Sequence, residues 1–465
     1  MDAIKTEVCV VGGGPGGYVA ALRAGQLGLK TVLVEQRALG GTCLNVGCIP
    51  SKSLIHVAEA FHRTKLQVSS SPFGLRVPGV SLDFPAALAW KDSIVGRLTG
   101  GVAGLLKKQN VTTLRGTAQI QDGKTCIVSS DKSPVRVEAN HLVLAPGSVP
   151  AELKALPFGG PVISSTDALA LHEIPSRLVV VGAGYIGIEL GTAFAKLGAD
   201  VTIVEGAERI LPAWDAELTR PVAKRLEQLG VRVLTSTLAR GLTDDGAQLL
   251  VASPPNGEPI ALPSDKILVA VGRKPRTEGF GLERLDLEMR GAFVRVDDRC
   301  QTSMRDVWAI GDVTGEPMLA HRAMAQAKVV AERIAGLHTE FDHAAVPAVC
   351  FSDPEIVSVG LSPAEAAASG RQVKVGTFPF LANGRALSQH DEAGFVRIVA
   401  HADTHRVLGI QAVGHDVAEL SATFGLAVEM GAALEDIAGT IHAHPTRGEA
   451  IHEAALGGLG HMLHL

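Results

Sequence analysis

The stretch Val8-Cys-Val-Val-Gly-Gly-Gly-Pro-Gly-Gly17 decides the fold of the first part of the chain. Its apolar residues predict a short buried strand, its glycines a tight turn, and the residues that follow a helix over 18–27. Gly12 permits the tight turn, Gly14 lets the backbone approach a pyrophosphate, and Gly17 lets helix and strand pack closely. The helix N-terminus then offers amide groups and the positive end of its dipole to a phosphate.

The same pattern returns 170 positions later, at 178–187. The repeated glycines are Gly182, Gly184 and Gly187. In both copies the next strand ends in an acidic residue, Glu35 or Glu205, that can accept hydrogen bonds from ribose hydroxyls. A single glycine triplet also occurs at ordinary strand-to-helix turns. Two triplets in full context predict an α/β fold with two Rossmann-like dinucleotide-binding domains.

Two dinucleotide sites indicate two dinucleotides, and a bound flavin beside a diffusible nicotinamide is the pair that can pass electrons. We therefore expect FAD at the first site and a nicotinamide dinucleotide at the second. Glu205 would repel the 2'-phosphate of NADP, and Arg209 is the only basic residue close behind it. The sequence therefore favours NAD over NADP.

Composition narrows the class of protein. The 465 residues are 46% hydrophobic with a net charge of -5, which fits two or three cored domains and does not favour nucleic-acid or anionic-membrane partners. Six cysteines are sparse for this length and indicate a reducing compartment. The first strand begins too early to leave room for a signal peptide, and no apolar run reaches the ~18 residues of a membrane span. We expect a cytoplasmic protein.

Two of the cysteines lie five positions apart in Gly40-Gly-Thr-Cys-Leu-Asn-Val-Gly-Cys-Ile-Pro-Ser-Lys52, on the helix expected after Glu35. In an ideal helix their Cα atoms would be about 8 to 9 Å apart, beyond the disulfide limit of about 7 Å. A bridge between Cys43 and Cys48 therefore needs a distorted turn, which Gly47 permits. The pair could be a redox-active disulfide, half of a metal site, or two buried structural thiols.

The cysteine stretch resembles the active-site signature of the flavin-dependent pyridine nucleotide-disulfide oxidoreductases, most closely of members that oxidise dihydrolipoamide. The resemblance extends over the whole chain and favours the redox-active disulfide. It implies further FAD contacts from Gly116, Lys52, Asp312, Met318 and Ala320, and an NAD-domain contact from Gly272. One departure is Pro146, where the family usually has threonine, in the loop that joins the two nucleotide domains.

The resemblance also implies roles for the remaining site residues. His444 would be the acid/base that takes a proton from the substrate dithiol, with Glu449 orienting its ring. His442 competes for that role but has the wrong spacing to the proline and glutamate that follow. An ion pair of Lys52 with Glu189 would lie beside the flavin, and Tyr185 would either gate the nicotinamide pocket or simply pack there.

The implied activity is oxidation of protein-bound dihydrolipoamide, with reduction of NAD, by a homodimer. Its partners would be the lipoyl domains of an acyltransferase core or the carrier protein of glycine cleavage. Two alternatives remain: a glutathione-reductase-like NADPH enzyme, disfavoured by Glu205, and a non-catalytic structural subunit, disfavoured by the intact cysteines and His444.

The predicted organisation has four segments. They are an FAD domain at 1–149, an NAD domain at 150–274, a return to the FAD domain at 275–345, and a C-terminal α+β interface domain at 346–465. Within the last segment the pattern predicts strands at 373–380 and 394–400 and a helix around 417–430.

Overall fold

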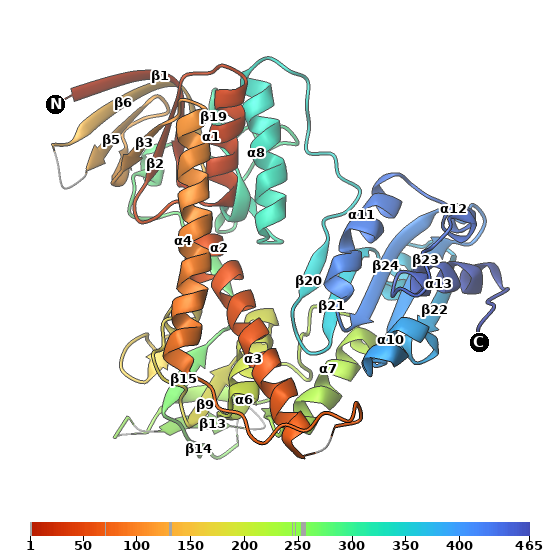
Figure 1. Cartoon of the computed structure of the whole chain (residues 1–465). Helices are drawn as coiled ribbons and strands as arrows, with labels where there is room; N and C mark the ends of the chain where they lie inside the picture. Colours follow the sequence, from red (N-terminus) through yellow and green to blue (C-terminus); the bar gives the residue numbers. More distant parts are fainter. Residues whose placement is uncertain (1, 70, 130–132, 244, 247, 253–256) are drawn as a thin grey trace.

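The computed structural model describes residues 2–69, 71–129, 133–243, 245–246, 248–252 and 257–465. Three large sheets with their helices form most of the molecule, and the third lies to one side of the other two (Figure 1). This is the predicted architecture of two Rossmann-like α/β units and a C-terminal α+β domain. None of the described helices is long and apolar enough to cross a membrane.

The first sheet has a parallel part built around β1 (Asp2–Val11). Its other parallel strands are β2 (Thr31–Glu35), β3 (Thr112–Arg115), β6 (Val135–Leu144) and β19 (Val307–Ala309). Antiparallel strands β4 (Thr117–Ile120) and β5 (Thr125–Ser129) extend the sheet beyond β6. Because β19 pairs with β6, the chain returns to this sheet after building the second one.

Helices α1 (Pro15–Gln26) and α8 (Ala320–Ile334) pack against each other beside the first sheet (Figure 1). The long helices α3 (Cys48–Ser69) and α4 (Phe84–Lys108) run from this sheet towards the second unit. The short helix α2 (Gly41–Val46) precedes α3. Helices α3 and α4 therefore connect the first nucleotide unit to the second.

The second sheet is fully parallel, in the order β11-β10-β9-β15-β8. Its strands are β8 (Val162–Ile163), β9 (Arg177–Val181), β10 (Asp200–Val204), β11 (Arg232–Leu234) and β15 (Lys266–Val269). Helix α6 (Tyr185–Leu197) follows β9, and α7 (Ala216–Gln228) follows β10. A small antiparallel sheet of β12 (Leu238–Leu242), β13 (Gln248–Ala252) and β14 (Ile260–Pro263) lies beside it. The predicted strand-turn-helix repeat is confirmed.

The C-terminal sheet is antiparallel, in the order β20-β21-β24-β23-β22. Its strands are β20 (Ala348–Cys350), β21 (Glu355–Gly360), β22 (Val373–Pro379), β23 (Phe395–His401) and β24 (Val407–Gly414). Its main helices are α11 (Ser421–Glu429), α12 (Leu434–Gly439) and α13 (Glu449–Leu459). The predicted strands correspond to β22 and β23, and the predicted helix to a 3-10 turn at Val417–Leu420 followed by α11.

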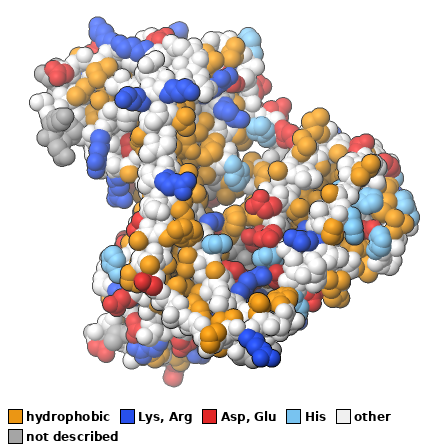
Figure 2. Space-filling model, in the orientation of Figure 1, with side chains coloured by type: hydrophobic (Ala, Val, Ile, Leu, Met, Phe, Trp, Pro, Cys, Tyr) orange, Lys and Arg blue, Asp and Glu red, His pale blue; other side chains and the backbone are white. Residues whose placement is uncertain are grey.

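The remaining described α-helices and strands are short: α5 (Ser165–Ala168), α9 (Pro363–Ala368), α10 (Gly384–Gln389), β7 (Ser148–Pro150), β16 (Arg273–Pro275), β17 (Met289–Arg290) and β18 (Phe293–Val294). β7 and β16 pair antiparallel where the chain passes between the two nucleotide units. On the face drawn in Figure 2, acidic and basic side chains are interspersed with apolar ones.

Candidate active site

A cavity of about 670 Å³ lies between the two nucleotide units. Many of the predicted site residues line it: Gly12, Gly14, Glu35, Cys43, Cys48, Lys52, Gly116, Tyr185, Glu189, Asp312, Met318 and Ala320. Gly17 lies in the helix behind the first turn. Gly182, Gly184 and Gly187 of the second turn and the C-terminal histidine motif are not among the described residues that line the cavity. The cavity is therefore associated with the first dinucleotide site.

The glycines of the first turn have different structural demands. A Cβ at Gly12, whose φ is +105°, would lie 2.1 Å from the Ala145 carbonyl oxygen, and one at Gly17 would lie 1.7 Å from the Gly12 oxygen. A Cβ at Gly14 would meet no protein atom closer than 3.9 Å, at the Gly41 Cα. Only Gly14 leaves open space, at the start of α1. This is the arrangement expected where a pyrophosphate approaches the backbone, so the residues fit a dinucleotide.

The second turn repeats this geometry. A Cβ at Gly182 would lie 2.6 Å from the Ala270 oxygen and one at Gly187 only 2.0 Å from the Gly182 oxygen. At Gly184, which caps α6, nothing lies within 4 Å. Gly272 has a φ of +123° in the loop before β16.

Because of this contrast, we expect Gly184→Ala to leave folding intact but to weaken NAD binding about tenfold or more, since the methyl group would occupy the space left for the pyrophosphate. Thermal unfolding and an NAD titration of the purified variant measure the two effects. Gly187→Ala is the matched control and should lower the melting temperature, because helix and strand could no longer pack. Unchanged NAD affinity in the first variant would remove Gly184 from the site.

The two acidic residues hold the turns in the same way. Glu35 accepts from the Gly13 amide at 2.7 Å with one oxygen and from the Arg37 amide at 2.7 Å with the other. Glu205 accepts from the amides of Ala183 and Ala207, at 2.6 and 2.8 Å. Each carboxylate thus joins the turn to the end of the next strand, and it lies at the position expected for a ribose contact.

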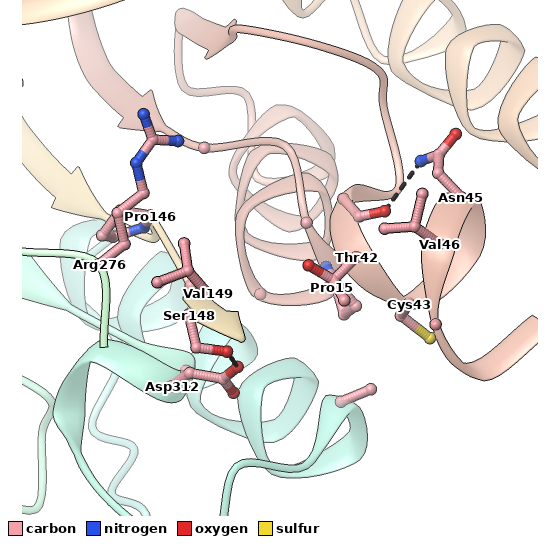
Figure 3. Close-up of a pocket in the computed structure, with 18 of the residues that line it drawn as sticks. Pro15, Thr42, Cys43, Asn45, Val46, Pro146, Ser148, Val149, Arg276 and Asp312 are labelled. Carbon is pink, nitrogen blue, oxygen red and sulfur yellow. Dashed lines mark hydrogen bonds between the residues drawn. The ribbon is translucent and has the colours of Figure 1, made fainter. Parts of the chain in front are cut away.

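Asp312 lies within a polar group that sequence reasoning did not find. Its carboxylate accepts a hydrogen bond from the Ser148 hydroxyl, as Figure 3 shows. Arg273 donates to the same hydroxyl oxygen at 2.7 Å and to the Ser148 carbonyl at 2.9 Å. Ser148 follows Pro146 and Gly147 and begins β7, just beyond the point where the parallel strand β6 ends at the cavity. That strand-end position was the available signal.

The cysteine pair lies on two helices, so the prediction of one helix carrying both was wrong. Cys43 belongs to α2, and Cys48 begins α3 after a break at Gly47. The break is explained by a close approach, because a Cβ at Gly47 would lie 2.9 Å from the Thr42 carbonyl oxygen. Both cysteines are free thiols in the structure and both line the cavity. The distorted turn that a bridge would require is therefore present.

The two thiols have different environments. A hydrogen bond from Cys43, with help from the Lys52 ammonium, lowers the pKa of Cys48 against the opposing effect of burial. The hydrogen bond to Cys48 and burial raise the pKa of Cys43 well above its ordinary value. The reduced pair therefore holds its first negative charge on Cys48, at the start of α3 and near Lys52.

Lys52 and Glu189 form the predicted ion pair, with Nζ and Oε2 2.8 Å apart. Glu189 is almost buried, and its other oxygen accepts from the Phe351 amide of the C-terminal domain at 2.9 Å. Tyr185 begins α6 and lines the same cavity. Burial raises the pKa of its phenol to about 12, so the hydroxyl stays protonated at neutral pH.

The C-terminal histidine motif forms a second polar group, far along the chain. The ring Nδ1 of His444 lies 2.8 Å from Glu449 Oε1, and the other carboxylate oxygen accepts from the Thr446 amide at 2.8 Å. Although burial opposes it, these bonds lower the pKa of Glu449 below its usual value. The His444 side chain is 79% exposed. His442 bonds the Thr440 carbonyl and stacks on His452, so it has no carboxylate partner among the described residues.

Residues 6–327 match the family model described as pyridine nucleotide-disulphide oxidoreductase, and residues 346–455 match the dimerisation domain of that family. The chain belongs to the pyridine nucleotide-disulphide oxidoreductase family. It is 56% identical to the dihydrolipoyl dehydrogenase of Pseudomonas aeruginosa over 99% of both chains. It is 45% identical to that of Geobacillus stearothermophilus, over 100% of this chain and 98% of the relative.

Among solved structures, the crystal structure of LpdA from Mycobacterium tuberculosis superposes with a TM-score of 0.89 at 26% identity. The match covers 97% of this chain and 99% of that one. The chain is therefore an oxidoreductase of this family, a flavoprotein whose cofactors are FAD and NAD. The open space at Gly14 and Gly184 is the structural feature that fits these two dinucleotides.

Proposed function

We propose that the chain oxidises protein-bound dihydrolipoamide to lipoamide and reduces NAD to NADH. The observation that carries this proposal is the placement of Cys43 and Cys48 in the cavity of the first nucleotide turn. The Lys52–Glu189 pair links that cavity to the second nucleotide unit. The proposal is further supported by relatives of this name at 56% and 45% identity over the full chain.

The sulfur chemistry balances as two thiol–disulfide exchanges. His444 takes a proton from one thiol of dihydrolipoamide, and the resulting thiolate attacks Cys43 in a Cys43–Cys48 disulfide. Cys48 leaves as a thiolate, which Lys52 stabilises. The second substrate thiol then displaces Cys43, so that cyclic lipoamide leaves and the enzyme keeps two electrons as a dithiol. Return of the dithiol to the disulfide releases these electrons, which reduce NAD.

The remaining site residues would hold the cofactors. For FAD these are Gly12, Gly14, Gly17, Glu35, Lys52, Gly116, Asp312, Met318 and Ala320; for NAD they are Gly182, Gly184, Gly187, Glu205 and Gly272. When bound, FAD supplies the two-electron relay between the sulfur pair and NAD. Glu189 would keep Lys52 charged beside that relay, because its carboxylate raises the pKa of Lys52 against the effect of burial.

The proposed assembly is a homodimer with shared active sites. Within one chain His444 does not line the cavity that holds the cysteines, and it lies in the segment that matches the family's dimerisation domain. In a two-fold dimer, His444 of the partner subunit would complete each site. Lipoyl domains of an acyltransferase core, or the glycine-cleavage carrier protein, would be the substrates. The cytoplasm remains the proposed location, because six cysteines are sparse for a chain of this length.

Two assays run side by side test the function. We expect the purified enzyme to reduce NAD with dihydrolipoamide at a high rate and to oxidise NADPH with glutathione disulfide at about 1% of that rate or less. Activity only in the second assay would replace the proposed function by that of a glutathione reductase. Purification of a folded protein without flavin would instead favour a structural subunit.

A further inference from the structure

Helices α3 and α6 pack side by side (Figure 1); α3 comes after β2 and α2 of the first nucleotide unit, and α6 follows the second nucleotide turn. Two ion pairs join them, Lys52 with Glu189 and Glu59 with Lys196. In both pairs the partners are 137 positions apart in the sequence, which shows that the two helices run parallel to each other. The pairs are separated by nearly two turns, about 10 Å along each axis. They therefore define the axial register of the two helices at two points.

The second pair belongs to a cluster in which Lys196 is buried and the other three residues are partly buried. Only 4% of the Lys196 side chain is exposed, and its ammonium contacts both Glu59 and Asp353, the latter at 2.8 Å. Arg225 of α7 reaches the same Asp353 oxygen at 2.7 Å. We call these four residues the Lys196 cluster. It contains two cations and two carboxylates from α3, α6, α7 and the C-terminal domain.

The chain between β20 and β21 touches both ion pairs. The Phe351 amide donates to Glu189, and the Lys52 ammonium lies 4.5 Å from the centre of the Phe351 ring. Two residues further on, Asp353 bonds to Lys196. The segment that leads into the C-terminal domain is thus fastened at both levels of the α3–α6 contact.

The charges of the Lys196 cluster depend on one another. Burial alone would raise the pKa values of Glu59 and Asp353, but the nearby Lys196 lowers both below their ordinary values. Both acids are therefore ionised at neutral pH. Among the described ion pairs, loss of Lys196 would leave Asp353 with Arg225 and Glu59 with Arg63 of its own helix, so the Glu59 contact between α3 and α6 would be lost. A slide of α3 along α6 would have the same consequence, so the cluster resists it.

We propose that Lys196 is a positioning residue for the sulfur chemistry proposed above, because with Glu59 and Asp353 it fixes the register of α3 on α6. α3 begins at Cys48 and carries Lys52, whereas α6 carries Glu189. The register therefore sets how the N-terminal end of α3, with Cys48 and Lys52, lies against the N-terminal half of α6, with Glu189. Lys196 lies outside the cavity and acts through the Lys52–Glu189 pair.

The test is Lys196→Met in the flavin-loaded enzyme. The Phe351 amide, which is bonded to Glu189, should exchange with deuterium about tenfold faster. In turnover we expect kcat to fall about fivefold while KM for NAD stays within about twofold. Lys196→Arg keeps the buried cation and should return both values to within about twofold of the unsubstituted enzyme.

Arg397→Met is the matched control. Arg397 is also buried and joins the C-terminal domain to the start of α7, through Glu217 at 2.7 Å and Asp215 at 3.2 Å, and none of its described ion pairs involves α3. The Arg397→Met variant should be less stable than the unsubstituted enzyme, but its Phe351 amide should not exchange with deuterium any faster. Unchanged exchange in Lys196→Met, or equal acceleration in Arg397→Met, would overturn the proposal. If Lys196→Met does not fold, Glu59→Gln carries the same test. Because exchange needs no substrate, failure of the dihydrolipoamide assay would not affect this result.

Discussion

Replacement of His444 by glutamine is expected to lower kcat for dihydrolipoamide oxidation about 10²- to 10³-fold, the usual contribution of a positioned acid/base. The reason is geometric: Glu449 accepts from His444 Nδ1 at 2.8 Å, which leaves the other ring nitrogen of an exposed side chain to take the thiol proton. Steady-state rates with dihydrolipoamide and NAD measure the effect.

Two controls separate proton transfer from folding. His442→Gln alters a neighbouring half-buried histidine whose described contacts are the Thr440 carbonyl and the His452 ring, and it should keep kcat within about twofold. Oxidation of NADH by ferricyanide requires no proton from a substrate dithiol and should persist in His444→Gln. A full rate of dihydrolipoamide oxidation in His444→Gln would show that His444 is not the acid/base. A large loss of rate in His442→Gln would instead assign that role to His442.

The two nucleotide units could be predicted because their turns are determined locally. Gly12 and Gly182 have φ values of +105° and +102°. A Cβ would lie 2.1 Å from a backbone oxygen at Gly12 and 2.6 Å from one at Gly182. Only glycine fits such positions, so sequence spacing reports the turn directly. Glu35 also belongs to this local pattern. Its carboxylate accepts a hydrogen bond from the Gly13 amide of the turn, and only helix α1 separates the two residues along the chain.

The features that escaped prediction depend on contacts between distant parts of the chain. The break between α2 and α3 is a partial exception, because it is local and the spacing of the cysteines already predicted a distorted turn at Gly47. Lys196 looks like an ordinary surface lysine in sequence, and it is buried because Glu59 and Asp353 arrive from other domains. The role of Ser148 likewise becomes visible only in the folded chain, where its hydroxyl donates a hydrogen bond to Asp312.

The positions of the cysteines and of His444 lead to the second large effect. Cys48 lies at the start of α3, whereas His444 lies just before α13, a helix that Figure 1 shows on the side of the C-terminal domain away from α2 and α3. Neither Cys48→Ser nor His444→Gln chains should oxidise dihydrolipoamide appreciably as homodimers. A mixed dimer distinguishes a shared site from one built within a single chain.

Co-refolding equal amounts of Cys48→Ser and His444→Gln chains should restore about a quarter of the unsubstituted activity. Random pairing makes about half of the dimers mixed, and each mixed dimer joins an intact Cys48 to an intact His444 of the partner subunit at one of its two sites. If each chain supplied its own base, every site would keep one broken residue. The absence of recovery, in a preparation where mass spectrometry of differently tagged chains shows mixed dimers, would therefore rule out the shared site.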